Sequence, residues 1–285
     1  MKNNPGVAGS GSSYKNGWNT IDTTADPHQW VRFMDRLNGG DAGEFFLNDT
    51  QTVAWLDLKV GHQILDVGCG TGGMARGLAL LTGSAGRVVA VDLSDTMLEE
   101  ARARSESFAN LEFVKADVHQ LPFADASFDR CHARNVFEVV DDPAQALGEM
   151  TRVLRPGGVI VIPAPDYGSL AIDGSDRPLT RAILNYIADV ESNGWVGRQL
   201  PYLFAQAGLT EIQIDVRAAI CNDFQYFFEH WLGSCIGRAM AAGVLTEAQA
   251  RAWLTEQQEH YRKNVFFAVN LAFMAAGRKP SADLG

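Results

Sequence analysis

The chain has 285 residues and a formal net charge of −10 at pH 7, with 46% hydrophobic and 20% charged side chains. This composition is typical of a globular protein with a sizeable core, and it excludes disorder over most of the length. The negative charge and the lack of Lys and Arg clusters argue against a DNA or RNA substrate. No stretch approaches the roughly 18 apolar residues of a membrane span, and the start lacks the apolar core of a signal peptide. We therefore expect a cytoplasmic protein.

The cysteines are Cys69, Cys131, Cys221 and Cys235. They show no C-x-x-C spacing and no companion histidines at zinc-finger distances, so we expect neither a disulfide framework nor a metal site. All four are interpreted as structural, with Cys69 a small residue inside a ligand loop.

Residues 1–18 are rich in Gly, Ser and Asn and are expected to form a flexible arm before a single domain over 19–285. The first helix is predicted to begin at Asp26, a good N-cap, because a proline follows at the first helical position. With a second helix over 49–58, the segment 19–60 is predicted to form a helical lid or flank before the first strand.

The stretch Gln63–Met74 has the pattern of a buried strand that runs into a glycine-rich turn. Its apolar residues are typical of a strand covered on both faces, and its glycines let a ligand approach the backbone closely. A helix follows, so the ligand would face amides at a helix N-terminus, which favour anionic groups. Because Gly68, Gly70 and Gly73 also satisfy the spacing of dinucleotide sites, a nicotinamide or flavin enzyme is the first rival.

Two carboxylates flank this turn. Asp66 stands two residues before the first glycine in an otherwise apolar strand, where a buried carboxylate is costly unless it is paired, and an amino group would serve. Asp92 ends the next apolar run, where an acidic residue can accept both hydroxyls of a ribose. Asp92 therefore suits either ligand, whereas Asp66 argues against the dinucleotide.

Strands and helices alternate from residue 63 onward, which predicts a parallel sheet with helices on both faces. Ligands on such sheets lie beyond the carboxyl ends of the strands. We predict strands near 63–67, 87–92, 111–116, 128–133, 158–162, 211–217 and 265–273, and helices near 72–81, 95–105, 142–154 and 177–190.

Three more motifs follow in order: Ala116-Asp117-Val118, Phe128-Asp129, and a Leu-Arg-Pro-Gly-Gly turn at 154–158. With the glycine turn, this set resembles the class I S-adenosylmethionine-dependent methyltransferases, especially the small-molecule branch that acts on quinones and natural products. The resemblance is strong over 63–162 and looser toward the C-terminus. It implies a Rossmann-like α/β doubly wound, mostly parallel sheet of seven strands in the order 3-2-1-4-5-7-6, with strand 7 antiparallel and a helical insertion over 222–263.

The resemblance implies S-adenosyl-L-methionine as cofactor. Asp117 would meet the adenine amino group, and the Val118 amide would meet a ring nitrogen; the structural alternative for Asp117 is a turn residue. The full set of predicted cofactor contacts is Asp66, Gly68, Cys69, Gly70, Thr71, Gly72, Asp92, Leu93, Met97, Ala116, Asp117, Val118 and Asn135.

The sequence departs from the family after the fourth strand. Relatives commonly carry a histidine before an Asp-Pro pair, but here Val139 stands in that place, with Glu138 beside it. If this chain uses a general base, that base must therefore be a group other than the family's histidine. Asp141 and Asp142 resemble a metal pair, but next to a proline they are better interpreted as caps of the following helix. We predict no metal.

The substrate side is less determined. Asp166 and Tyr167 lie in a stiff turn after the fifth strand, and Tyr14 in the N-terminal arm is a candidate to close the site. The insertion is dense in aromatic residues, including Phe228 and Trp231, which suit a flat or apolar substrate, although a core between lid and sheet explains them as well. His230 is the histidine best placed to deprotonate a substrate hydroxyl, the alternative being a structural histidine. His132, inside the fourth strand, is interpreted as structural.

These patterns predict methyl transfer to oxygen or carbon of a small, largely apolar metabolite in secondary metabolism. One alternative is a methyltransferase-like cyclase or cofactor-binding protein without methyl transfer. A less favoured alternative is an NAD(P)-dependent oxidoreductase, because Asp66 and the Pro156–Gly158 turn argue against it. We expect a small-molecule partner, no nucleic acid and no membrane span; a homo-oligomer stays open.

Overall fold

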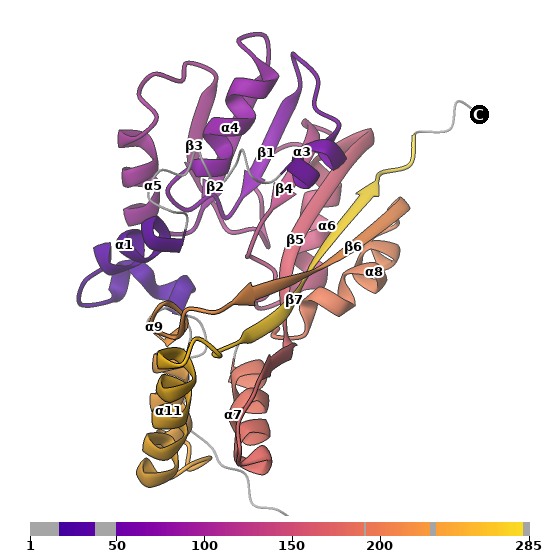
Figure 1. Ribbon diagram of the computed structural model, residues 1–285. Helices are drawn as coiled ribbons and strands as arrows, with labels where there is room; N and C mark the ends of the chain where they lie inside the picture. The colour runs from indigo at the N-terminus through magenta and orange to yellow at the C-terminus, as the bar shows by residue number, and fades with distance from the viewer. Residues whose placement is uncertain (1–16, 38–49, 191, 229–231, 282–285) are drawn as a thin grey trace, which may run out of the picture.

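The computed structural model describes residues 17–37, 50–190, 192–228 and 232–281. These residues form one seven-stranded sheet in the order β3-β2-β1-β4-β5-β7-β6 (Figure 1). β1 to β5 are parallel, and β7 runs antiparallel to both of its neighbours. The predicted α/β fold and strand order are thus confirmed. The strands are β1 (Gln63–Val67), β2 (Arg87–Asp92), β3 (Leu111–Lys115), β4 (Phe128–Ala133), β5 (Leu154–Ile172), β6 (Thr210–Cys221) and β7 (Ala268–Arg278).

Different helices cover the two faces of the sheet. Leu65 and Ile160 belong to a core cluster with α6 and α8, whereas Ile64 and Val88 belong to a cluster with α3, α4 and α5. This division follows from the alternation of side chains along each strand. Within the described ranges, no helix is long and apolar enough to cross a bilayer. The helices are the 3-10 helix η1 (Gly17–Thr23), α1 (His28–Leu37), α3 (Thr50–Leu56), α4 (Gly73–Thr82), α5 (Asp95–Ala103), α6 (Pro143–Val153), α7 (Arg177–Val190), α8 (Val196–Gln206), α9 (Phe224–Phe227), α10 (Gly233–Ala241) and α11 (Glu247–Arg262).

The last three strands differ in extent from the sequence-based expectation. β5 continues ten residues past its predicted end at 162, β6 continues past 217, and β7 is shifted from 265–273 toward the C-terminus. β7 lies between β5 and β6 and pairs with both, so its small residues stay within the ladder although they lack strand propensity. Tertiary pairing, rather than the apolar run, sets these bounds.

The two ends of β7 illustrate this correction. Val265, at the predicted start, is 63% exposed and precedes the strand. Gly277, near the observed end, lies against α8, and a Cβ there would stand 2.7 Å from Phe204 Cδ1. A residue without a side chain lets the helix and the strand approach at that point.

A second core lies beyond the carboxyl end of β5. Leu170 and Ile172 at the end of β5 pack with α7, α9, α10 and α11, and we call these four helices the helical cap. Figure 1 shows α7, α9 and α11 grouped past the tips of the long strands. A capping box lies at the start of α11, since Thr246 Oγ1 accepts from the Gln249 N–H and Gln249 Oε1 accepts from the Thr246 N–H. The helical insertion is therefore a packed unit.

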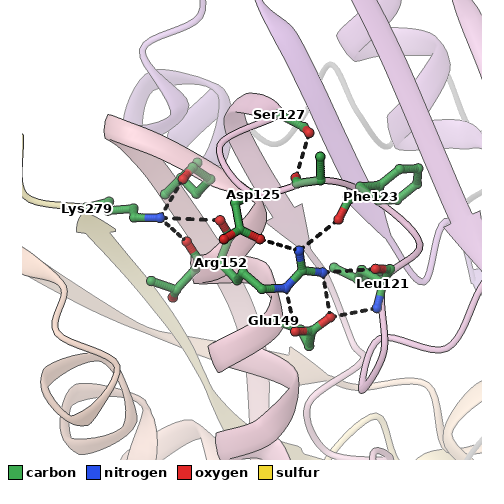
Figure 2. A network of polar contacts seen from close by, with 10 residues as sticks. Leu121, Phe123, Asp125, Ser127, Glu149, Arg152 and Lys279 are labelled. Atoms are coloured by element: carbon green, nitrogen blue, oxygen red, sulfur yellow. Dashed lines mark hydrogen bonds and ion pairs between the residues drawn. The ribbon is translucent and has the colours of Figure 1, made fainter.

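A polar network lies at the amino ends of β4 and β5, away from the helical cap (Figure 2). Arg152 at the end of α6 donates to both carboxylate oxygens of Glu149 and to Asp125, at 2.7 to 2.8 Å. Lys279, just after β7, donates to the carbonyl oxygens of Thr151 and Leu154 at 2.7 and 2.8 Å. The amino ends of β4 and β5 are thus fixed, whereas the carboxyl end of β5 packs against the helical cap.

Candidate active site

The glycine loop, residues 68–73, joins β1 to α4. Gly68 has φ +66°, a conformation that L side chains rarely adopt, and a Cβ there would lie 2.2 Å from Val136 Cγ2 in the segment after β4. Glycine is therefore required both for the turn and for the contact between neighbouring strand ends. Above the loop, the Cε of Met34 in α1 lies 3.3 Å from the position of a Cβ on Gly70. Helix α1 thus covers the loop.

Asp92 at the end of β2 holds the glycine loop in place. Its Oδ2 accepts the N–H of Gly70 at 2.8 Å, and its Oδ1 accepts the N–H of Ser94 at 3.0 Å. Burial raises the pKa of Asp92, and these backbone hydrogen bonds oppose the rise. Each carboxylate oxygen keeps a further lone pair, so a diol can still be accepted at this strand end.

A second acidic residue lies next to Asp92 and was missed in the sequence. Asp22 of η1 accepts the Ser94 hydroxyl and the backbone N–H groups of Asp95 and Thr96, at 2.7 to 3.1 Å. Burial alone would raise the pKa of Asp22, but these donors lower it to about 2. Because Asp22 and Ser94 together cap α5, the N-terminal segment is fixed beside Asp92.

The loop after β3 is held by a histidine that the sequence reading did not single out. His119 Nδ1 lies 2.6 Å from Asp117 Oδ1, and His119 Nε2 accepts the N–H of Asp142 at 3.2 Å. Because Nε2 accepts, we assign the ring proton to Nδ1, which donates to Asp117. Asp142 also caps α6 by accepting the Gln145 N–H, as predicted. The Asp117 loop is therefore fixed to the N-terminus of α6.

Asp66 is 2% exposed and lies directly opposite His132 of β4, which is 1% exposed. His132 Nδ1 and Asp66 Oδ1 are 2.7 Å apart. The other oxygen, Asp66 Oδ2, has no hydrogen-bond partner within the part of the chain that the structure describes, and neither has His132 Nε2. A buried carboxylate oxygen that lacks a donor fits the amino group of a cofactor whose amino-acid end lies near the glycine loop.

The remaining predicted cofactor residues surround this site in different ways. Cys69 is nearly buried, and burial raises the pKa of its thiol well above the usual range, so it is not a nucleophile. Leu93 is 41% exposed beside Asp92, whereas Met97 packs under η1 with Ile21. Asn135 has φ +53° and donates its N–H to the Pro163 carbonyl, which ties the segment after β4 to the middle of β5. The others lie in the loops already described: Thr71, Gly72, Ala116 and Val118.

The predicted substrate residue Asp166 is fully buried, and its carboxylate is already bound. Arg198 Nε donates to Oδ2 at 2.5 Å and a second guanidinium nitrogen donates to Oδ1 at 2.6 Å, while the guanidinium lies 4.2 Å from the ring centroid of Trp195. Any contact between Asp166 and a substrate would therefore act through Arg198. Tyr167, the next residue, donates its N–H to the Gly194 carbonyl.

Most described aromatics of the insertion belong to the core of the helical cap. Trp253 is 2% exposed and donates to Thr180 Oγ1 at 2.9 Å, and Phe224 packs on Phe266. Phe228 is half-buried against Phe224, with 5.8 Å between ring centroids. Tyr14, His230 and Trp231 lie outside the described residues. The core interpretation of the aromatic cluster thus holds for Phe224 and Trp253.

Two hollows elsewhere contain none of the predicted site residues. One of about 640 Å³ lies at the amino ends of β2 and β3, and one of about 320 Å³ lies between α10 and α11. Among the described residues, no cluster of three His, Cys, Asp or Glu side chains could hold a metal ion. The site is defined instead by its convergent strand ends.

Comparison with known proteins agrees with this geometry. Residues 65–162 match the family model described as a methyltransferase domain. An uncharacterized 37.1 kDa protein in transposon TN4556 of Streptomyces fradiae is 35% identical over 254 residues, which cover 88% of this chain and 72% of that one. The demethylmenaquinone methyltransferase of Staphylococcus aureus strain MRSA252 is 40% identical over 106 residues, 37% of this chain and 44% of the enzyme.

A putative methyltransferase from Bacillus halodurans C-125 has the same fold, with a TM-score of 0.58 and 22% identity over 82% of this chain and all of that one. The chain belongs to the class I S-adenosylmethionine-dependent methyltransferases. Membership of this family gives S-adenosyl-L-methionine as the cofactor, and it excludes the rival dinucleotide interpretation of the glycine loop.

Proposed function

We propose that this enzyme transfers the methyl group of S-adenosylmethionine to an oxygen or carbon of a small, largely apolar metabolite of secondary metabolism. The observation that carries the proposal is the arrangement of Asp66, Asp92 and Asp117 at the carboxyl ends of adjacent strands β1, β2 and β3. Three carboxylates in this order suit an amino group, a ribose and an adenine. A second nucleotide has no place in it.

In this assignment Asp66 accepts the ammonium of the cofactor, Asp92 accepts the ribose hydroxyls, and Asp117 accepts the adenine amino group while the Val118 amide meets the ring. The bound cofactor supplies a methyl group already activated by the sulfonium charge. The protein therefore mainly has to align a nucleophile with the methyl–sulfur bond and exclude water. Met34 over the glycine loop supports the second task, because α1 closes that side with an apolar side chain.

The helical cap supports an apolar acceptor. It extends past the carboxyl end of β5, and Phe228, which is half-buried against its aromatic and aliphatic core, lies at its margin. The relative whose name gives demethylmenaquinone as its substrate supports the same class of acceptor. Tyr167, Phe228, Tyr14 and Trp231 are the proposed substrate contacts, and Asp166 takes part through Arg198.

The proposed base is His230, which titrates near neutral pH when unperturbed. If it deprotonates a hydroxyl, His230→Ala should lower kcat by about 10²–10⁴-fold, with partial recovery at high pH where the acceptor ionises unaided. His260, on the outer helix α11, gives a matched control, since His260→Ala should leave the rate unchanged. A small, pH-independent loss for His230→Ala would identify catalysis by alignment alone.

The deciding experiment has two stages. Calorimetry with the purified enzyme should show S-adenosylhomocysteine binding in the micromolar range and no NAD(P) binding. The enzyme is then incubated with methyl-labelled cofactor and extracts of the cells that make the protein. Mass spectrometry is used to find products in which a labelled methyl group has replaced a hydrogen. Cofactor binding with no labelled acceptor in any extract would favour the cyclase or cofactor-binding alternative.

A further inference from the structure

The pair Asp66 and His132 has an arrangement that a purely structural pair does not need. Both side chains are almost completely buried, on neighbouring strands and in direct register. They lie between β1 and β4, where the strand order reverses, and Asp66 is two residues from the start of the glycine loop. In open α/β sheets this reversal is the point at which ligands bind.

The hydrogen bonding of the pair is incomplete in a specific way. Once His132 Nδ1 and Asp66 Oδ1 are joined at 2.7 Å, Asp66 Oδ2 and His132 Nε2 are left without partners in the described part of the chain. Half-satisfied buried polar pairs are unfavourable, and a fold that needed only a filled space here would hold two apolar side chains. The missing partner of the carboxylate is a hydrogen-bond donor, and an ammonium group is donor only.

The single contact that the carboxylate makes within the sheet also fixes its direction. A carboxylate on a short side chain can rotate about its last bond, and without His132 nothing described here would hold Oδ1. With Oδ1 bound by the imidazole, Oδ2 is the one oxygen left for the ligand. His132 therefore controls which oxygen faces the cofactor and at what angle.

We propose that His132 is a positioning residue for the amino-acid end of the cofactor: its Nδ1–H donates to Asp66 Oδ1 and holds Oδ2 ready for the ammonium group. This inference rests on the cofactor site proposed above. It replaces the purely structural role expected for His132, and it assigns the histidine no contact with the reacting atoms. Its effect should be confined to the amino-acid half of the ligand.

Comparing the binding of two ligands distinguishes the amino-acid half of the cofactor from its nucleoside half. S-adenosylhomocysteine carries the amino acid, whereas 5′-methylthioadenosine keeps the adenine, the ribose and a methylthio group but lacks the amino acid. His132→Leu removes the donor, and His132→Asn restores it, because the Asn amide nitrogen can stand in for Nδ1. Cys131→Ala, in the next position of β4 and equally buried, controls for the loss of packing in the strand.

We expect His132→Leu to weaken S-adenosylhomocysteine binding by about tenfold to a hundredfold, as for a lost hydrogen bond to a charged group, while methylthioadenosine affinity stays within about twofold. His132→Asn should recover most of the loss, and Cys131→Ala should leave the ratio of the two affinities unchanged. Equal weakening for both ligands, or none for either, would overturn the positioning role. A wild-type enzyme that binds neither ligand would instead refute the proposed function.

A measurement on the wild-type protein covers the case in which His132→Leu does not fold. Long-range ¹H–¹⁵N spectra of the histidine rings report which nitrogen carries a proton. The His132 ring should carry a proton on Nδ1, and S-adenosylhomocysteine, but not methylthioadenosine, should shift its signals. A ring protonated on Nε2 alone, or a response to both ligands alike, would contradict the proposal.

Discussion

Asp92 accepts the backbone N–H of Gly70 at 2.8 Å, so the end of β2 and the glycine loop are bonded directly to each other. The same carboxylate accepts the N–H of Ser94 on its other oxygen. The carboxylate of Asp92, which is proposed to bind the ribose, therefore also holds the glycine loop in its conformation. Mutations at Asp92 should consequently change cofactor affinity and stability together.

Asp92→Ala should weaken S-adenosylhomocysteine binding about tenfold to a hundredfold, because hydrogen bonds to a charged group contribute about 1.5–3 kcal/mol. It should also lower the free energy of unfolding, since two backbone N–H groups lose their acceptor. Calorimetry and urea denaturation measure the two effects. Asp95→Ala, three residues away and paired only with the exposed Lys115, is the control and should leave affinity within about twofold. Unchanged affinity in Asp92→Ala would place the ribose elsewhere.

Gly68→Ala should destabilise the protein by about 2 kcal/mol or more, because φ is positive and the new Cβ overlaps Val136. The double variant Gly68→Ala/Val136→Ala should recover the overlap part of that loss but not the conformational part. Gly237→Ala in α10 is the control: nothing lies within 4 Å of its Cβ position, and the helix should gain about 0.5–1 kcal/mol. If the losses in unfolding free energy of the two single variants, Gly68→Ala and Val136→Ala, simply add in the double variant, the predicted contact between the two side chains is contradicted.

The Asp166–Arg198 pair should respond asymmetrically to mutation. Arg198→Met leaves a carboxylate that is 0% exposed without its cationic partner, with only the backbone N–H of residue 198 still donating to it, and should cost about 3–5 kcal/mol. Asp166→Asn leaves a guanidinium that is 38% exposed and can reach water, so we expect a smaller loss of about 1–2 kcal/mol. Urea denaturation of both variants tests the order. A larger loss for Asp166→Asn than for Arg198→Met would contradict this asymmetry.

Acid should weaken the attachment of the N-terminal segment. The pKa of Asp22 is lowered to about 2 by its hydrogen bonds, from an ordinary value near 3.8. A depressed folded-state pKa gives stability that is complete above the unfolded-state value and is lost as the pH falls through the folded-state value. Because Asp22 is exposed to solvent, we expect only about 1 kcal/mol.

Asp22→Asn should therefore be less stable than the wild type above about pH 5, and the difference should vanish as the pH falls from about 4 to about 2. Stability curves by urea denaturation at several pH values measure this window. Asp26→Asn, whose partner Arg32 is exposed, is a suitable control. A difference between wild type and Asp22→Asn that persists at pH 2 would show that the cap does not depend on charge.

The cofactor half of the molecule was predictable because its signals are local. Glycine spacing, a carboxylate at the end of each apolar run and the cap at Asp142 are each read from a few consecutive residues, and the structure places them at one edge of the sheet. His132 escaped this reading because its significance depends on a residue 66 positions away. The register of β1 against β4 would have revealed the pair.

The substrate half was less predictable because its determinants are long-range. Asp166 was expected in a loop that could touch substrate, but α8 supplies Arg198 as its partner. The aromatic residues of the insertion suited a pocket or a core equally, and the packing of Phe224 on Phe266 favours the core. Neither partner is marked by local pattern or spacing. The extents of β6 and β7 depended likewise on pairing across the insertion.

The position of β7 has a consequence for how the chain acquires its structure. Among the strands that the structure describes, β6 pairs only with β7, and β7 is synthesised after the whole insertion. Strands β1 to β5 can form their sheet during synthesis, whereas the β6 segment has no strand to pair with until β7 has been made. The cofactor half can thus mature first. A nascent chain that stalls within α11 would carry the folded strands β1 to β5, with the proposed nucleoside site, together with an unpaired strand edge prone to aggregation.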